Sequence, residues 1–248
     1  MKQYDMKTYD TISEAYLGTL ADVLDNPDYV CAPRGLPIRE KLDYMFRVLH
    51  PTVEPIKTLD PERNAVIESY TKKEMDLYNS CSNRVEDFEK ASKFWKHLAN
   101  ADGTINSAYG YLIWKNKSIG NMQFEGIMRT PWEYAIESLR KDKDTRQAIL
   151  RFSLPEHQYM TNKDVTCTLS ANFLIRDNKL HLSVVMRSND LQKGLTYDAG
   201  FFISLIYRAI EELKDIYPDL TCGHYTHMSH SMHLYEKDVP TILKMLGR

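Results

Sequence analysis

Cys167 is the residue whose type and position best suit covalent chemistry. It lies in the segment DVTCTLSANFLIRD, at the start of a strand-like run. A thiolate is a strong nucleophile, although most free cysteines only pack in the interior. The following strand-like run ends in MRSND at 186–190, where a guanidinium and a hydroxyl can hold an oxyanion such as a phosphate, and arginine favours a thiolate. Together, the two segments predict a nucleophile beside an anion site.

Four histidines near the end of the sequence form the second arrangement that could bind a ligand. His224, His227, His230 and His233 are spaced three apart, and Cys222 precedes them. Imidazole and thiolate are good zinc ligands, but residues three apart alternate faces on a strand and drift around a helix. The row also lacks the paired spacing of structural zinc motifs. We therefore expect no metal here and interpret the histidines as surface or hydrogen-bonded side chains.

The overall composition is that of an ordinary globular protein. The 248 residues include 32 Lys and Arg against 34 Asp and Glu, and 43% are hydrophobic. The two charge signs are interleaved, so we expect neither a nucleic acid polymer nor a membrane as partner. The apolar run 199–207 is too short to cross a bilayer, and the charged first ten residues are unlike a secretory signal, so the cytoplasm is the expected compartment. Four scattered cysteines do not suggest a disulfide scaffold. We expect a single domain over residues 1–248.

Apolar periodicity predicts the helices that must position these residues. Spacings of three and four indicate helices within the first thirty residues and at 64–78, 83–95 and 199–214, with Cys81 in the break between the second and third. Pro131 suits the first turn of another helix. Five prolines between 31 and 61 predict extended segments and turns around Arg34-Gly35.

Alternation with a period of two predicts the strands. It is visible at 148–152, and the runs 168–175 and 180–187 form a hairpin through the turn RDNK. A short strand is expected near 233–235, followed by a helical tail. One face of the hairpin should pack against the core, leaving the other able to carry chemistry. The class predicted is α+β, a mixed β-sheet flanked by helices.

The order and spacing of several short motifs resemble the thymidylate synthase superfamily, and within it the phage deoxycytidylate hydroxymethylases. The motifs are Tyr109-Gly110, Thr145-Arg146-Gln147, Cys167 before a hairpin, RSND at 187–190, Gly194 followed by Tyr197-Asp198, and HLY at 233–235. The synthases carry histidine where Thr168 stands, a second arginine where Gln147 stands and asparagine where Asp198 stands. The resemblance covers residues 74–235 and implies a thymidylate synthase-like fold that forms a homodimer through its sheet.

The resemblance also implies roles for individual residues. Cys167 matches the nucleophile that adds to C6 of a pyrimidine, and Glu74 matches the glutamate that organises water and proton transfer around the base. The residues matched to the nucleotide are Arg34, Arg187, Ser188, Asn189, Asp190, His233 and Tyr235, with Arg146 supplied by the other subunit. Arg39 competes with Arg34 for the phosphate. Trp95 and Tyr109 match positions near the folate. Each could instead be a surface ion pair or a core aromatic.

Asp198 is the residue that chemistry ties most directly to the identity of the base. Uracil presents an N3-H donor and an O4 acceptor, whereas cytosine presents an N3 acceptor and a 4-amino donor. A protonated carboxyl can satisfy cytosine, and a carboxylate can pair with cytosine protonated at N3. The alternative is that Asp198 caps a helix beginning near Ala199.

The resemblance to this superfamily implies a one-carbon transferase. The expected reaction transfers a one-carbon unit from 5,10-methylenetetrahydrofolate to C5 of dCMP, giving 5-hydroxymethyl-dCMP. Three alternatives remain: a dCMP methyltransferase, a relative specific for dUMP or CMP, and a metal- or nucleotide-binding protein that uses the histidine row.

Overall fold

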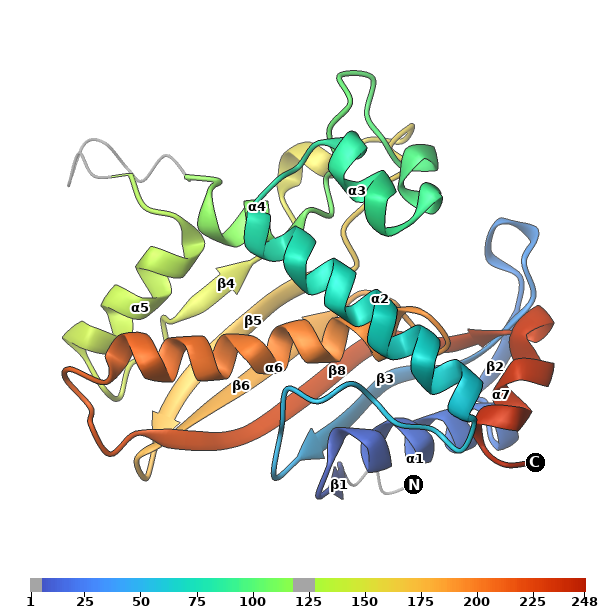
Figure 1. Cartoon of the computed structure of the whole chain (residues 1–248), viewed down its shortest axis with the longest axis horizontal. Helices are drawn as coiled ribbons and strands as arrows, with labels where there is room; N and C mark the ends of the chain where they lie inside the picture. The colour runs from blue at the N-terminus through green and yellow to red at the C-terminus, as the bar shows by residue number, and fades with distance from the viewer. Residues whose placement is uncertain (1–5, 118–127) are drawn as a thin grey trace.

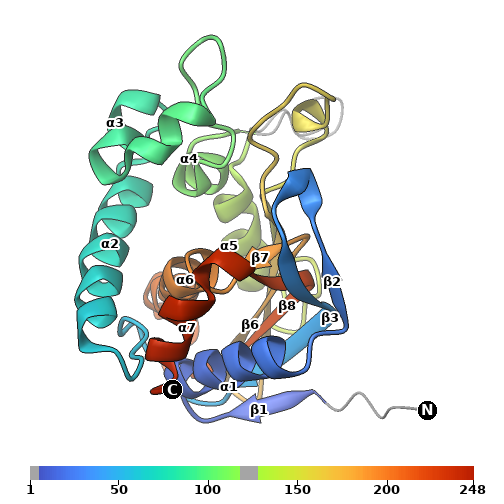
Figure 2. The ribbon, with the colours of Figure 1, turned by 90° about the vertical axis from the view of Figure 1, so that its right-hand side faces the viewer.

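The chain folds around one mixed β-sheet, and its helices gather on one face of that sheet (Figures 1 and 2). The computed structural model describes residues 6–117 and 128–248. Within them the strands are β1 Lys7–Tyr9, β2 Tyr29–Cys31, β3 Ile38–Val48, β4 Ile149–Arg151, β5 Thr168–Arg176, β6 Lys179–Met186, β7 Asn189–Asp190 and β8 Thr221–Tyr235. The helices are α1 Ile12–Asp25, α2 Pro61–Ser80, α3 Val85–Ala91, α4 Tyr109–Trp114, α5 Pro131–Lys141, α6 Gly194–Leu213 and α7 Val239–Met245. Short 3-10 turns are η1 Pro33–Gly35, η2 Lys93–His97, η3 Pro155–His157 and η4 Glu236–Asp238.

The sheet combines parallel and antiparallel pairs, which confirms the predicted α+β class. Its main strand order is β1-β3-β8-β6-β5-β4, with β2 paired to β3 and β7 paired to β8. The long central strand β8 runs antiparallel to β3 and parallel to β6. No helix in the described ranges is long and apolar enough to cross a bilayer.

The predicted hairpin is confirmed as β5 and β6. Asp177 and Asn178 form its turn with φ angles of 51° and 55°, a left-handed conformation that these two residue types tolerate well. Leu180, Leu182 and Val184 alternate toward the core, and all three are buried. The hairpin therefore fixes Cys167, the residue immediately before β5, at one end of the sheet.

Helix α6 is longer than the sequence predicts. The apolar stripe indicates a helix from about 199, whereas α6 begins at Gly194 because the buried Leu195 anchors an extra turn against the core. Asp198 therefore lies inside the helix, and the alternative that it caps a helix starting near Ala199 is wrong. The residue at the cap position is Lys193, whose side chain makes no capping hydrogen bond.

Strand β8 is also longer than expected, since it spans fifteen residues rather than a short segment at 233–235. Its apolar alternation is hidden in the sequence because His227 and Ser229 occupy buried positions that apolar residues normally fill. The prediction of one helix over 83–95 is also wrong. Helix α3 stops before Ser92, whose Oγ accepts a hydrogen bond from the Phe94 amide and starts η2.

The core lies between the sheet and helices α1 and α6. Tyr16 of α1 is fully buried and donates a hydrogen bond to the Leu191 carbonyl, which ties the first helix to the segment before α6. Aromatic rings of Tyr109, Phe152 and Phe202 pack against one another nearby. This packing holds the ends of β5, β7 and α6 together, where most of the candidate residues lie.

Candidate active site

The Cys167 thiol and the Arg187 guanidinium are neighbours, as the sequence predicts. Backbone pairing places them together, because the Arg187 amide donates to the Cys167 carbonyl. Arg187 Nη2 lies 3.6 Å from Cys167 Sγ, and the same guanidinium donates to the carbonyls of Val165 and Thr166. Burial raises the pKa of the Cys167 thiol, and Arg187 opposes that rise. The resting group at neutral pH is therefore a thiol held beside a cation.

Arg34 approaches the same site from the turn between β2 and β3. Its φ of 53° is in the left-handed region and turns the chain at η1. The Arg34 guanidinium lowers the pKa of both the Cys167 thiol and the Tyr235 hydroxyl, although burial raises both overall. The competing residue, Arg39, is already used elsewhere, because it pairs with Glu236 at 2.7 Å and donates to the Leu24 carbonyl. The geometry thus favours Arg34 over Arg39 as a ligand for an anion.

The second wall of the site comes from β7 and the end of β8. Asp190 pairs with His233 in register, and the rings of His233 and Tyr235 meet edge to face at 5.4 Å. Burial raises the pKa of Asp190, and His233 counteracts that effect. Ser188 lies half-buried between β6 and β7. Side chains from the two strands are therefore close enough to contact one small ligand.

Two carboxyl groups, Glu74 of α2 and Asp198 of α6, lie behind the thiol. Burial raises the pKa of Glu74 to about 8, with a further increase from Asp198, whereas hydrogen bonds with Tyr78 and Tyr70 lower it. Burial raises the pKa of Asp198 to about 7, against a hydrogen bond from Asn189 Nδ2 to Oδ2 at 3.2 Å. Both groups can therefore exchange protons near neutral pH, as general acids and bases must.

Tyr109 lies within electrostatic reach of the thiol and of both carboxyl groups. Its hydroxyl accepts a hydrogen bond of 2.8 Å from Thr168, the residue that follows the nucleophile candidate. Gly110 allows α4 to lie directly against α2, since a Cβ at that position would lie 1.8 Å from the Tyr78 carbonyl oxygen. The Tyr109-Gly110 pair therefore needs its glycine for the contact between α4 and α2.

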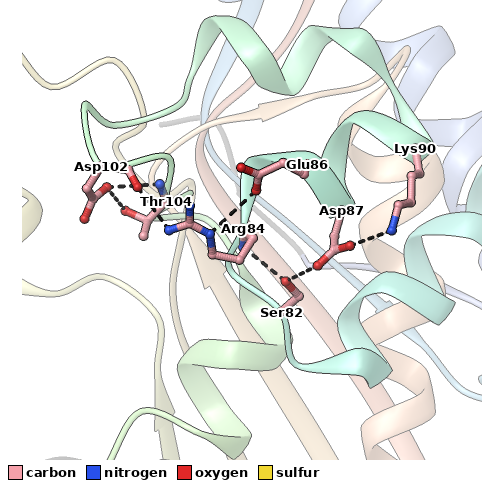
Figure 3. Close-up of polar contacts among 7 residues, drawn as sticks. All are labelled: Ser82, Arg84, Glu86, Asp87, Lys90, Asp102 and Thr104. Carbon is pink, nitrogen blue, oxygen red and sulfur yellow. Dashed lines mark hydrogen bonds and ion pairs between the residues drawn. The ribbon is translucent and has the colours of Figure 1, made fainter.

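Trp95 enters the site region on η2, and a set of polar contacts holds that segment in place. The Trp95 indole donates to the Tyr70 hydroxyl at 3.3 Å. Figure 3 shows polar contacts around the start of α3, in which Ser82 donates to Asp87 at 2.6 Å and Arg84 donates to the Asp102 carbonyl at 3.0 Å. These bonds fasten α3, and hence η2, to the loop around Asp102.

Arg146 is the one predicted site residue that lies away from the others. It precedes β4, whose Ile149 pairs with Asn172 of β5. Asn172 is five residues from Cys167, which corresponds to about 17 Å along an extended strand. Arg146 lies farther from Cys167 in the same direction. Its side chain is exposed. The structure therefore does not bring Arg146 to the Cys167 of its own chain.

Sequence reasoning missed an aromatic and cationic group over the site. The rings of Tyr70 and Tyr197 are 4.2 Å apart, and Arg63 Nη2 donates to the Tyr197 hydroxyl and to the Gln192 carbonyl. On α2, Tyr70 lies four residues before Glu74, and Tyr78 lies four residues after it. This spacing places the three side chains on one helical face, and it is the signal that could have identified the two tyrosines as neighbours of Glu74.

The histidine row is dispersed over β8. His227 is fully buried and shares a 2.7 Å hydrogen bond with Tyr225, while His230 is exposed and contacts Asp43. His224 packs against His181, with ring centroids 3.9 Å apart and the ring planes tilted by 38°. Among the described residues, no three His, Cys, Asp or Glu side chains are grouped closely enough to hold a metal ion.

Comparisons with known proteins show which family and fold this chain is similar to. The thymidylate synthase family model matches residues 15–248. Deoxycytidylate 5-hydroxymethyltransferase of Enterobacteria phage T4 is 28% identical over 155 residues, covering 60% of this chain and 59% of that protein, so the match spans less than two thirds of its length. Deoxyuridylate hydroxymethyltransferase of Bacillus phage SP01 is 27% identical over 233 residues, covering 91% of this chain and 57% of that protein. The structure of thermostable thymidylate synthase A from Bacillus subtilis has a TM-score of 0.71 at 18% identity, covering 96% of this chain and 84% of that one.

Proposed function

This chain belongs to the thymidylate synthase family, and we propose that it transfers a one-carbon unit to C5 of dCMP and forms 5-hydroxymethyl-dCMP. The observation that carries the proposal is the position of Asp198, a carboxyl in a site that also holds the Cys167 thiol and the Glu74 carboxyl. A carboxyl suits cytosine because it can donate to N3 and accept from the 4-amino group.

The side chains support a stepwise covalent reaction. Cys167 loses its thiol proton, and Sγ adds to C6 of the base across the C5=C6 double bond, which makes C5 nucleophilic. Asp198 pairs with the cytosine edge, and Glu74 holds a proton or a water molecule beside the reacting carbon. Arg187, Ser188 and Arg34 hold the phosphate, while His233 and Tyr235 hold the sugar hydroxyl. Asn189 and Asp190 complete the nucleotide side of the site.

The one-carbon donor proposed is 5,10-methylenetetrahydrofolate, which would supply the methylene carbon in exchange for the C5 proton and leave as tetrahydrofolate. Water would then add to that carbon as Cys167 is released, giving the hydroxymethyl group. The site fits a flat ring with polar edges, because Trp95, Tyr70 and Tyr197 form a continuous aromatic wall and Tyr109 lies next to the thiol. Arg63 Nε and Gln192 Oε1 are buried beside that wall without a hydrogen-bond partner. Two such atoms are costly to bury unless a ligand satisfies them.

The proposed active unit is a homodimer that pairs through the sheet face opposite the helices. A single row across that face holds Asn172, Ser183, Thr226 and Arg47 in register. Three atoms of the row, Asn172 Oδ1, Thr226 Oγ1 and Arg47 Nε, are buried without a partner. A second copy stacked on this face would supply the missing hydrogen bonds and bring its Arg146 toward the neighbouring site.

The substrate assignment is tested by exchanging the carboxyl for an amide. Asp198→Asn should shift kcat/KM from dCMP toward dUMP by about tenfold to a hundredfold, because an amide pairs with N3-H and O4 instead. Glu133→Gln is the matched control, because it removes one exposed carboxylate at the start of α5. It should leave the ratio of kcat/KM for dCMP and dUMP unchanged. If Asp198→Asn keeps the wild-type ratio, Asp198 does not read the base, and the assignment of dCMP loses its main physical support.

A further inference from the structure

A neutral carboxyl group can pair with either pyrimidine, depending on which oxygen carries the proton. When the carboxyl hydroxyl points to N3 of the base and the carboxyl C=O points to the group on C4, the carboxyl matches cytosine. When the C=O points to N3 and the hydroxyl points to the group on C4, it matches uracil. The pKa of Asp198 is raised to about 7, so a large share of this side chain is neutral at physiological pH. The preference of Asp198 for cytosine therefore depends on which of its two oxygens carries the proton.

Asn189 makes the two oxygens of Asp198 unequal. It lies on β7, is 2% exposed, and donates from Nδ2 to Asp198 Oδ2 at 3.2 Å. A carboxyl oxygen that accepts a hydrogen bond retains carbonyl character, since the proton is more favourable on the other oxygen. The contact thus favours neutral Asp198 with its proton on Oδ1 and with Oδ2 as an acceptor.

Gly194 makes this contact possible. It is the first residue of α6, and a Cβ built there would lie 2.8 Å from Asn189 Nδ2 and 3.5 Å from Asp198 Oδ2. Any larger residue would push the amide away from the carboxyl. The short segment from β7 into α6 therefore holds the Asn189 amide next to the Asp198 carboxyl, and Gly194 leaves room for the contact.

We propose that Asn189 is a positioning residue which fixes the proton of neutral Asp198 on Oδ1 and thereby selects cytosine over uracil. The inference rests on the proposed function, in which the Asp198 carboxyl faces N3 and position 4 of the base. In this arrangement Oδ1 donates to N3, and Oδ2 accepts from both Asn189 and the 4-amino group. Without Asn189, the carboxyl proton can move to Oδ2, and uracil fits as well.

The test measures the binding of dCMP and dUMP by calorimetry, so that it does not depend on turnover. Asn189→Leu removes the donor and keeps the approximate volume, and Gly194→Ala displaces the donor without removing any polar group. Both should lower the preference for dCMP over dUMP by about tenfold, mainly through tighter dUMP binding. Gly200→Ala is the matched control on the same helix, because its Cβ would meet only the Thr71 methyl group at 3.4 Å.

The outcomes separate this inference from the proposed function. If Asn189→Leu and Gly194→Ala both keep the wild-type preference, or if they weaken both nucleotides equally, Asn189 does not select the base and the inference is overturned. If the wild-type protein itself prefers dUMP, the proposed substrate is wrong whatever the variants do. Should Asn189→Leu fail to fold, Gly194→Ala decides alone, because alanine is well tolerated in a helix.

Discussion

At the scale of single residues, neighbouring groups have opposing effects on the pKa of the Cys167 thiol. Burial and the Asp198 carboxyl raise its pKa, and the Arg187 and Arg34 guanidinium groups lower it. A phosphate bound to the two arginines would remove part of their favourable effect. The Asp198 carboxyl must therefore be neutral for the thiolate to form easily, which agrees with the raised pKa of Asp198.

Replacing the proposed nucleophile, Cys167, should reduce turnover far more than nucleotide binding. Cys167→Ser should reduce turnover by more than about a thousandfold, because a serine hydroxyl is a far weaker nucleophile without a dedicated base. Binding of dCMP should change by less than about threefold, since the phosphate and base contacts lie on other residues. Steady-state kinetics and calorimetry measure the two quantities. Cys81→Ser, at the end of α2, is the matched control and should retain full turnover.

The buried Glu74 carboxyl predicts a pH-dependent stability. In the unfolded chain it ionises near its ordinary pKa, whereas in the folded protein it keeps its proton up to about pH 8. The folded state binds more protons in this window, so its free energy of unfolding falls as pH rises. Glu74→Gln should match the wild type near about pH 5 and exceed its stability near about pH 9 by on the order of a few kcal/mol. Urea unfolding at both pH values checks this, and a pH-independent difference would refute it.

At the scale of elements, the polar contacts at the start of α3 should affect the proposed folate side of the site more than the proposed nucleotide side. Ser82 Oγ accepts from the Arg84 amide and donates to Asp87, which holds the start of α3. Ser82→Ala should raise the KM for the folate about fivefold by loosening Trp95, and leave the KM for dCMP nearly unchanged. Ser138→Ala, which removes a hydroxyl on α5, is the control. An equal rise in both KM values would show that the segment serves general stability.

Regular elements with one buried stripe could be predicted from the sequence, as for α1, α2, α5 and the β5–β6 hairpin. The prediction is wrong where tertiary packing replaces the local pattern. The first turn of α6 is held by Leu195, and the long strand β8 carries polar residues at buried positions. Motif order identified most of the candidate residues, but the Asn189–Asp198 hydrogen bond depends on a close approach at Gly194. No sequence pattern reports that distance.

At the scale of the whole molecule, the position of Arg146 predicts a shared active site. Arg146 precedes β4, beside the end of β5 that lies far from Cys167 of the same chain, and its side chain is exposed. Mixing Arg146→Ala with Cys167→Ser under subunit exchange should restore about one quarter of the wild-type activity, because half of the dimers are then mixed and each has one intact site. Arg151→Ala, which removes an exposed arginine five residues along the chain, should keep its activity without mixing and so controls for the loss of a nearby positive charge. Failure of the mixture to regain activity would exclude a shared site.

The most direct test of the account is the elemental composition of the product formed from dCMP and 5,10-methylenetetrahydrofolate. The proposal predicts a nucleotide that has gained one carbon, two hydrogens and one oxygen, with the oxygen derived from labelled water and no product from Cys167→Ser. Formation of 5-methyl-dCMP, which lacks that oxygen, would replace the hydroxymethyl assignment by methylation. Conversion of dUMP with dCMP left unchanged would contradict the central claim that this site acts on cytosine.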